Sequence, residues 1–220
     1  NYLIKYSDLT EVHRVKLIDW LIDVHQHFEL RPETLYLTVN IIDRYLSEEI
    51  VPINKLQLVG ISSLFIASKY EEIYPPELRD FSYITKNKCV KEEILSTENK
   101  ILKKLQFNLL TISPLLIFNR LYFLSAQNKN DFLSNQFDQV FHLANFLMEL
   151  CLLEYKMLKY PSSIIASAAL FCSRKIVHLK PSWPNDEIIK QVNLDQQVIL
   201  ECFKEMTLLI KKEKSSTIKT

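Results

Sequence analysis

Apolar side chains recur along most of the chain at the three- and four-residue spacing that places them on one face of an α-helix. In the first half this spacing predicts five helices, over residues 10–28, 32–47 and 54–71, a short stretch after Pro76, and residues 90–105. The clearest apolar stripe lies in the first of these helices and consists of Val12, Leu17, Trp20, Leu21 and Val24.

The second half of the chain shows the same plan. One helix is expected to begin at Ser113-Pro114, because serine caps a helix start and proline fits its first position. Further helices are expected over residues 134–153, 162–179, a short stretch over 185–192, and 195–212.

A shift of 106 positions aligns the two halves. It places Leu64–Lys69 on Leu170–Lys175, and Pro75 on Pro181. Agreement between prolines and apolar positions indicates a structural duplication. The sequence therefore predicts an all-α protein with two consecutive five-helix bundles, over residues 1–110 and 111–220.

Small side chains interrupt the apolar ones in the third helix of each half, and they let neighbouring helices approach closely. We therefore expect each third helix at the centre of its bundle, wrapped by the other four. The small residues are Gly60, Ser62, Ser63 and Ala67 in the first half, and Ala166, Ser167, Ala168 and Ala169 in the second.

Composition narrows the possible functions. Gly60 is the single glycine among 220 residues, so no glycine-rich loop can hold a nucleotide phosphate. A formal net charge of +1 gives no global field to attract nucleic acid or an anionic membrane. No apolar run reaches the roughly 20 residues of a membrane span. Since the sequence starts at Asn1 with neither methionine nor a secretory core, we expect a piece of a longer intracellular protein of the nucleus or cytoplasm.

Four cysteines, Cys89, Cys151, Cys172 and Cys202, are widely spaced and mostly sit in apolar helical patterns. A disulfide framework or a zinc site would cluster them. They are expected to be reduced and to act as small core side chains.

No constellation for catalysis is found. His25 and His27 lie two positions apart, so on a helix they face different ways and cannot share a metal ion. Adjacent carboxylates such as Glu71-Glu72 diverge in the same way and are expected on solvated faces. The sequence therefore predicts a protein that is not an enzyme and holds no metal or cofactor.

Three charged residues stand at unusual positions. Arg14 and Asp43 lie among apolar residues of the first and second helices, where they can satisfy one another as a bidentate pair. Lys69 closes the apolar third helix, where a favourable interaction with the helix dipole would suffice to explain it.

Several motifs resemble the cyclin family, most closely the A- and B-type mitotic cyclins. Residues 13–24, HRVKLIDWLIDV, resemble the opening of the cyclin box, and residues 42–47, IDRYLS, its second-helix signature. Residues 55–60 and 67–77 resemble the third-helix signature. The motifs lie within about residues 8–109, and the remainder matches the second cyclin fold mainly through its pattern.

This resemblance implies a non-catalytic subunit that forms a heterodimer with a cyclin-dependent protein kinase and activates it in G2/M control. Lys69 and Glu98 match a charged pair that contacts the kinase backbone beside its regulatory helix, and Arg14 and Asp43 match an internal pair. Apolar contacts around the kinase helix are expected from Ile66, Tyr70, Leu102, Phe107 and Leu109.

Many cyclins also carry a shallow groove on the first helix that captures substrates and inhibitors with an Arg-x-Leu motif. His13 and Lys16 stand where the family usually has methionine and isoleucine, so a hydrated cation replaces part of an apolar wall. The residues that match the groove are Leu17, Trp20, Asp23, Leu56 and Gln57.

Three alternatives remain from the sequence. A scaffold of the factor-IIB type shares the double helical fold but should carry a basic face for DNA. A transcriptional cyclin would pair with a different kinase and resemble the mitotic pattern less. An unrecognised all-helical enzyme would need a charged cleft.

Overall fold

The computed structural model describes residues 2–126, 135–180 and 195–217. Every regular element within these ranges is a helix, so the predicted all-α class is confirmed. The chain forms two compact units, Asn1–Thr111 and Ile112–Thr220. No helix in the described ranges has the length and apolar character needed to cross a membrane.

The first unit contains the five helices that the apolar spacing predicts, each within a few residues of the expected bounds. Two short 3₁₀ helices, η1 and η2, precede α1 and α3. The elements are η1 (Tyr2–Lys5), α1 (Glu11–His27), α2 (Pro32–Glu48), η2 (Ile53–Lys55), α3 (Leu56–Glu71), α4 (Leu78–Ile84) and α5 (Lys91–Lys104).

The second unit repeats this order in its described part. The short helix expected over residues 185–192 lies outside the described residues. The Ser113 hydroxyl caps the first helix by accepting from the Leu116 amide at 3.3 Å. The elements are α6 (Pro114–Ser125), α7 (Asn135–Leu153), η4 (Tyr155–Lys159), α8 (Ser162–Ile176) and α10 (Gln196–Thr217).

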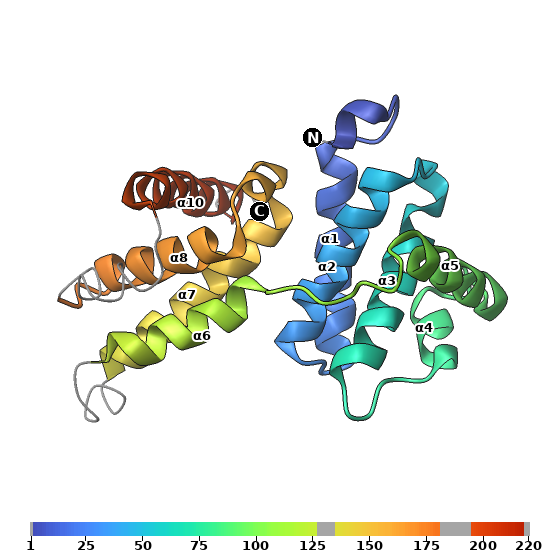
Figure 1. The fold of residues 1–220 in the computed structure, drawn as a ribbon, viewed down its shortest axis with the longest axis horizontal. Coiled ribbons are helices and arrows are strands. Elements are labelled where there is room, and N and C mark those ends of the chain that lie inside the picture. Colours follow the sequence, from blue (N-terminus) through green and yellow to red (C-terminus); the bar gives the residue numbers. More distant parts are fainter. Residues whose placement is uncertain (1, 127–134, 181–194, 218–220) are drawn as a thin grey trace. The chain divides into compact units, whose positions relative to one another are not determined.

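Helix α3 forms the centre of the first unit and packs against α1, α2, α4 and α5, as Figure 1 shows. Every residue from 58 to 68 is buried, and at Gly60 a Cβ atom would lie 2.8 Å from Leu17 Cδ1 on α1. The glycine therefore lets α1 and α3 approach closely. Helix α8 likewise packs against α6, α7 and α10. The predicted central position of α3 is confirmed.

Four helices end without the glycine that usually terminates them. After α1, α4, α5 and α8 the chain takes a positive φ at Glu29, Lys86, Gln106 and His178, between 51° and 60°. Each end carries the paired backbone bonds of a Schellman motif. A non-glycine residue has a steric cost in this conformation, which the surrounding structure must offset.

The four cysteines are buried and free, which confirms the prediction of reduced core side chains. Burial raises the pKa of Cys172 to about 11 and that of Cys202 to about 12. It also raises the pKa of Cys151 well above its ordinary value, and nearby Cys202 adds to the effect. These thiols are therefore held in the neutral form that suits a hydrophobic core.

Candidate functional site

Lys69 and Glu98 form an ion pair between the last turn of α3 and the middle of α5. The two helices pack side by side, which brings residues 29 positions apart into contact. The Lys69 side chain is 42% exposed and that of Glu98 only 12%, while the lysine Nζ lies 4.1 Å from the centre of the Phe65 ring. The lysine therefore balances the charge of a nearly buried carboxylate while its side chain stays partly exposed to solvent.

Apolar side chains continue along both helices from this ion pair. Ile66 and Tyr70 lie one turn apart on α3, the first buried and the second exposed. Leu102 is half-buried one turn after Glu98 on α5. Residues three or four positions apart share one face of a helix, so Lys69 lies beside Ile66 on α3 and Glu98 lies beside Leu102 on α5.

The end of α5 supplies an exposed aromatic ring. Phe107 is 67% exposed and has a φ of 58°, while its amide donates to the Leu102 carbonyl at 2.9 Å. The next apolar residue, Leu109, is half-buried and its amide donates to the Phe107 carbonyl at 3.0 Å. We call seven residues of α3, of α5 and of the segment that follows α5 the Lys69 surface: Ile66, Lys69, Tyr70, Glu98, Leu102, Phe107 and Leu109.

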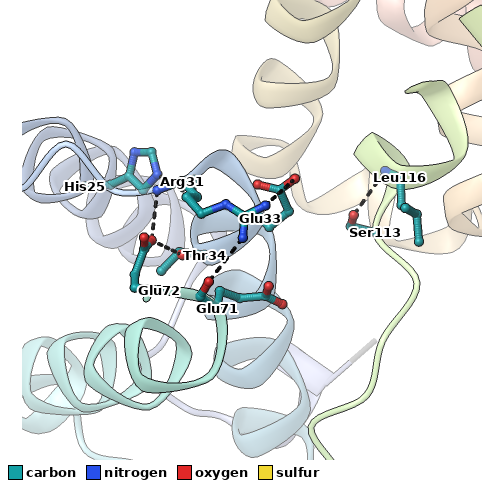
Figure 2. A network of polar contacts seen from close by, with 8 residues as sticks. All are labelled: His25, Arg31, Glu33, Thr34, Glu71, Glu72, Ser113 and Leu116. Carbon is teal, nitrogen blue, oxygen red and sulfur yellow. Dashed lines mark hydrogen bonds and ion pairs between the residues drawn. The ribbon is translucent and has the colours of Figure 1, made fainter. Parts of the chain in front are cut away.

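A polar network that the sequence analysis missed lies next to this surface, at the end of α3 (Figure 2). The Arg31 amide donates to Glu72 Oε1 at 2.8 Å, and the Thr34 hydroxyl donates to the same oxygen. The Arg31 guanidinium donates to the Glu71 carbonyl at 3.3 Å, and His25 Nε2 lies 2.9 Å from the Arg31 carbonyl. The network thus joins the end of α1, the start of α2 and the end of α3.

Arg14 and Asp43 are brought together in the interior, where they join α1 to α2. Arginine Nε lies 2.8 Å from Oδ1, and Nη2 lies 2.7 Å from Oδ2. The Tyr2 hydroxyl of η1 donates to Oδ1 at 2.7 Å. Burial alone would lower the pKa of Arg14, but the hydrogen bond and charge of Asp43 raise it above its ordinary value. The pair lies outside the Lys69 surface. Its role is structural, because it joins α1 to α2.

The groove residues divide between the core and the surface. Leu17 and Leu56 are buried, Trp20 and Gln57 are half-buried, and Asp23 is exposed.

The two departures from the groove pattern lie at the start of α1. His13 Nδ1 accepts from the Thr10 amide at 3.2 Å, so the ring is engaged at the helix start. Lys16 is exposed. The structure gives His13 a capping role, where an apolar side chain would line the groove.

Within the described ranges, no three histidine, cysteine or carboxylate side chains are grouped so that they could hold a metal ion. The geometry of the Lys69 surface, a charged pair with apolar neighbours at two helix ends, is suited to contact with another protein. Buried apolar anchors and a few charged groups are what such contacts use.

Sequence profiles of two domains match nearly the whole chain. The profile of the cyclin N-terminal domain matches residues 1–110, and that of the cyclin C-terminal domain matches residues 116–220. The chain therefore belongs to the cyclin family.

Within the family, similar relatives are named as B-type or G2/mitotic-specific cyclins. The G2/mitotic-specific cyclin-B of Spisula solidissima is 50% identical over 80% of this chain and 39% of its own length. Cyclin-B1-3 of Oryza sativa subsp. japonica is 40% identical over 94% of this chain and 42% of its own length. The G2/mitotic-specific cyclin S13-7 of Glycine max is 39% identical over 92% of this chain and 75% of its own length. The chain spans less than half the length of the first two relatives.

Solved structures share the fold at low identity. A viral cyclin from herpesvirus saimiri superposes with a TM-score of 0.79 at 16% identity, over 93% of this chain and 87% of that one. A chain of the yeast TFIIK complex of Kin28, Ccl1 and Tfb3 gives a TM-score of 0.62 at 17% identity, over 89% of this chain and 84% of that one. These similarities support the cyclin fold in both units.

Proposed function

We propose that this chain binds a cyclin-dependent protein kinase as a non-catalytic subunit and activates it in G2/M control. The relatives named G2/mitotic-specific cyclins support the cell-cycle role. The observation that carries the proposal is the partly exposed Lys69–Glu98 ion pair, which joins α3 and α5, two helices whose C-terminal ends carry the exposed rings of Tyr70 and Phe107. A nuclear or cytoplasmic location follows from this role.

The Lys69 surface would act through binding alone. Lysine offers three donors and glutamate two acceptor oxygens, a set suited to the backbone carbonyls and amides of a kinase loop. Docked apolar side chains would hold the regulatory helix of the kinase inward, where its glutamate pairs with the ATP-binding lysine. Binding energy then selects the active conformation of the partner, so activation is a shift of population.

The mitotic role is favoured over the alternatives by the relatives themselves. The three relatives described above are B-type or G2/mitotic cyclins. A DNA-holding scaffold of the factor-IIB type would need an excess of basic groups, whereas the formal net charge is +1. The kinase that the chain binds is thus proposed to be of the mitotic class.

We further propose that the groove around Leu17 and Trp20 recruits Arg-x-Leu substrates and inhibitors only weakly. His13 uses its ring nitrogen at the start of α1, and Lys16 places an exposed ammonium group beside the groove. Compared with the usual methionine and isoleucine, His13 and Lys16 reduce the apolar area that such a peptide could cover.

The proposal is tested by titrating purified mitotic cyclin-dependent kinase with Lys69→Ala and Glu98→Ala. Truncating one partner of a desolvated charged contact costs about 2–5 kcal/mol, and even the lower figure is more than tenfold in affinity. Lys55→Ala is a matched control, because Lys55 forms an exposed ion pair with Glu93 of the same helix α5 at 2.8 Å.

The expected result is loss of kinase binding and activation for the first two variants, wild-type binding for the control, and thermal unfolding close to wild type for all. If Lys69 serves only as a helix-end cation, Lys69→Ala will lose a little stability and bind normally. Wild-type activation by both Lys69→Ala and Glu98→Ala would exclude the Lys69 surface as the docking site.

A further inference from the structure

Helix α2 begins at a residue that cannot cap it. The capping position is held by Arg31, whose side chain has no acceptor and makes no capping hydrogen bond. Pro32 follows and has no amide to donate. The acceptor comes instead from Glu72, directly after α3, which takes the Arg31 amide at 2.8 Å and the Thr34 hydroxyl on one oxygen (Figure 2). A carboxylate is therefore placed at the positive end of the α2 dipole.

The same residues close the end of α3 in return. The last carbonyls of a helix have no partner within it. The Arg31 guanidinium donates to the Glu71 carbonyl at 3.3 Å, and the Glu72 amide donates to the Ser68 carbonyl at 2.9 Å. Arg31 and Glu72 thus form a reciprocal cap, in which each satisfies groups at the end of the other's helix.

Apart from the Lys69–Glu98 ion pair, the chain that follows gives this end of α3 little support. The chain after Glu72 continues through Ile73 and Tyr74, which are 82% and 91% exposed and give no packing support. By contrast, Thr34 is completely buried, so its hydroxyl depends on Glu72 as an acceptor. The reciprocal cap therefore ties the end of α3 to α2, as the Lys69–Glu98 ion pair ties its last turn to α5.

We propose that Glu72 is a positioning residue, which fixes the last turn of α3 and thereby the direction of Lys69 and Tyr70 toward a kinase. The inference rests on the proposed function and names a residue outside the Lys69 surface. Lys69 lies three positions before Glu72, within the turn that the Glu72 amide closes. If that turn frays, the lysine loses its fixed distance to Glu98, and Tyr70 loses its place on the docking face.

If Glu72 had only a structural role, its loss would lower stability without acting through Lys69. A double-mutant cycle separates this structural role from the positioning role. The variants are Glu72→Ala, Glu72→Gln, Lys69→Ala and the Glu72→Ala/Lys69→Ala double variant. Ser82→Ala is the destabilised control, because it removes another buried hydrogen bond of this unit, from the Ser82 hydroxyl to the Cys89 carbonyl at 2.8 Å. Each is titrated with purified mitotic cyclin-dependent kinase, and amide exchange is followed at residues 69–72.

Glu72→Ala is expected to weaken kinase affinity about tenfold, which is about 1.4 kcal/mol. Glu72→Gln keeps an acceptor oxygen and should therefore retain most of the wild-type kinase affinity. In the Lys69→Ala background, Glu72→Ala should weaken the affinity clearly less than in the wild-type background, because only the effect through Tyr70 remains. Ser82→Ala should bind as the wild type does.

Fully additive losses, or wild-type affinity for Glu72→Ala, would overturn the proposal. The exchange measurement stands apart from the proposed function. Should the wild-type chain bind no kinase, the proposed function fails, and amide exchange still decides the positioning role. Faster exchange at residues 69–72 in Glu72→Ala than in Ser82→Ala supports the cap, and equal exchange refutes it.

Discussion

Arg14 and Asp43 form a two-point ion pair in the interior of the first unit, with nitrogen–oxygen distances of 2.8 and 2.7 Å. The Arg14 side chain is only 1% exposed, and Asp43 also accepts from the Tyr2 hydroxyl. Each charge has given up water for the other, so neither can be removed without leaving its partner uncompensated.

Substitution of Arg14→Met is expected to lower the free energy of unfolding by about 3–5 kcal/mol, because the Asp43 charge is then left partly buried and unpaired. The Arg14→Met/Asp43→Leu double variant should be more stable than the sum of the two single changes predicts, since it removes both charges. Urea unfolding of the three variants measures this. Equal unfolding free energies for wild type and Arg14→Met would show that the pair contributes nothing.

The end of α5 offers two neighbouring substitutions with the same effect on the backbone and different effects on binding. Gln106 and Phe107 both have positive φ, at 53° and 58°. Glycine at either position removes the steric cost of that conformation, so each variant should gain up to about 1 kcal/mol of stability. Gln106→Gly should bind the kinase normally. Phe107→Gly should bind at least about tenfold more weakly, because an exposed aromatic contact is lost.

Thermal unfolding and kinase titration of both variants provide the check. Loss of stability in both would mean that the positive φ carries no cost at this end of α5. Normal binding by Phe107→Gly would remove Phe107 from the Lys69 surface.

The groove hypothesis makes a prediction with opposite signs for binding and stability. Replacing both residues, His13→Met with Lys16→Ile, should strengthen binding of a fluorescent Arg-x-Leu peptide, because an apolar wall is restored. The same change removes the bond from the Thr10 amide to His13 Nδ1, at a cost of about 1 kcal/mol of stability. Fluorescence polarisation and thermal unfolding measure the two effects.

Lys16→Ile alone keeps the His13 cap and should gain affinity without that loss. Asp19→Asn, at an exposed position of the same helix, is the control for a change of charge. Tight peptide binding by the unchanged chain, with no gain in the double variant, would contradict the hypothesis.

The buried thiols should be protected from alkylation while the protein is folded. Burial raises the pKa of Cys172 to about 11 and of Cys202 to about 12, from an ordinary value near 9. At pH 8 a small alkylating agent should therefore modify both only after unfolding in urea, as peptide mass mapping can show. The folded state holds the thiol protons of Cys172 and Cys202 more tightly than the unfolded state does. The stabilisation that results is complete below about pH 9 and is lost as the pH rises toward 12. Labelling of folded Cys202 at the unfolded rate would contradict this.

The sequence predicts the helices well because their apolar spacing is regular and prolines mark many of their starts. The sequence also predicts that α3 lies at the centre of its unit, because small residues such as Gly60 let neighbouring helices approach closely. For α8 the apolar spacing predicts an end at residue 179, whereas the helix ends at Ile176. The difference arises because His178, with a φ of 60°, takes the place of the glycine that signals a helix end.

The polar network at Glu72 could not be found in the same way. Its bond to Arg31 joins residues 41 positions apart, and a contact of that range leaves no local pattern. One signal is present in the sequence, because an arginine before Pro32 cannot cap a helix and implies an acceptor from elsewhere. The resemblance supplied the residues of the Lys69 surface and of the groove. Their roles in docking stay predictions.

The close approach at Gly60 joins the interior to the candidate groove. Leu17 matches a residue of the expected groove, and its Cδ1 atom lies 2.8 Å from where a side chain at position 60 would begin. A larger residue at position 60 would displace the Leu17 side chain. Evolution therefore cannot adjust the groove through Leu17 without also adjusting the contact between α1 and α3. If the groove recruits substrates as proposed, a substitution in the middle of the core would be observed as a defect in substrate choice.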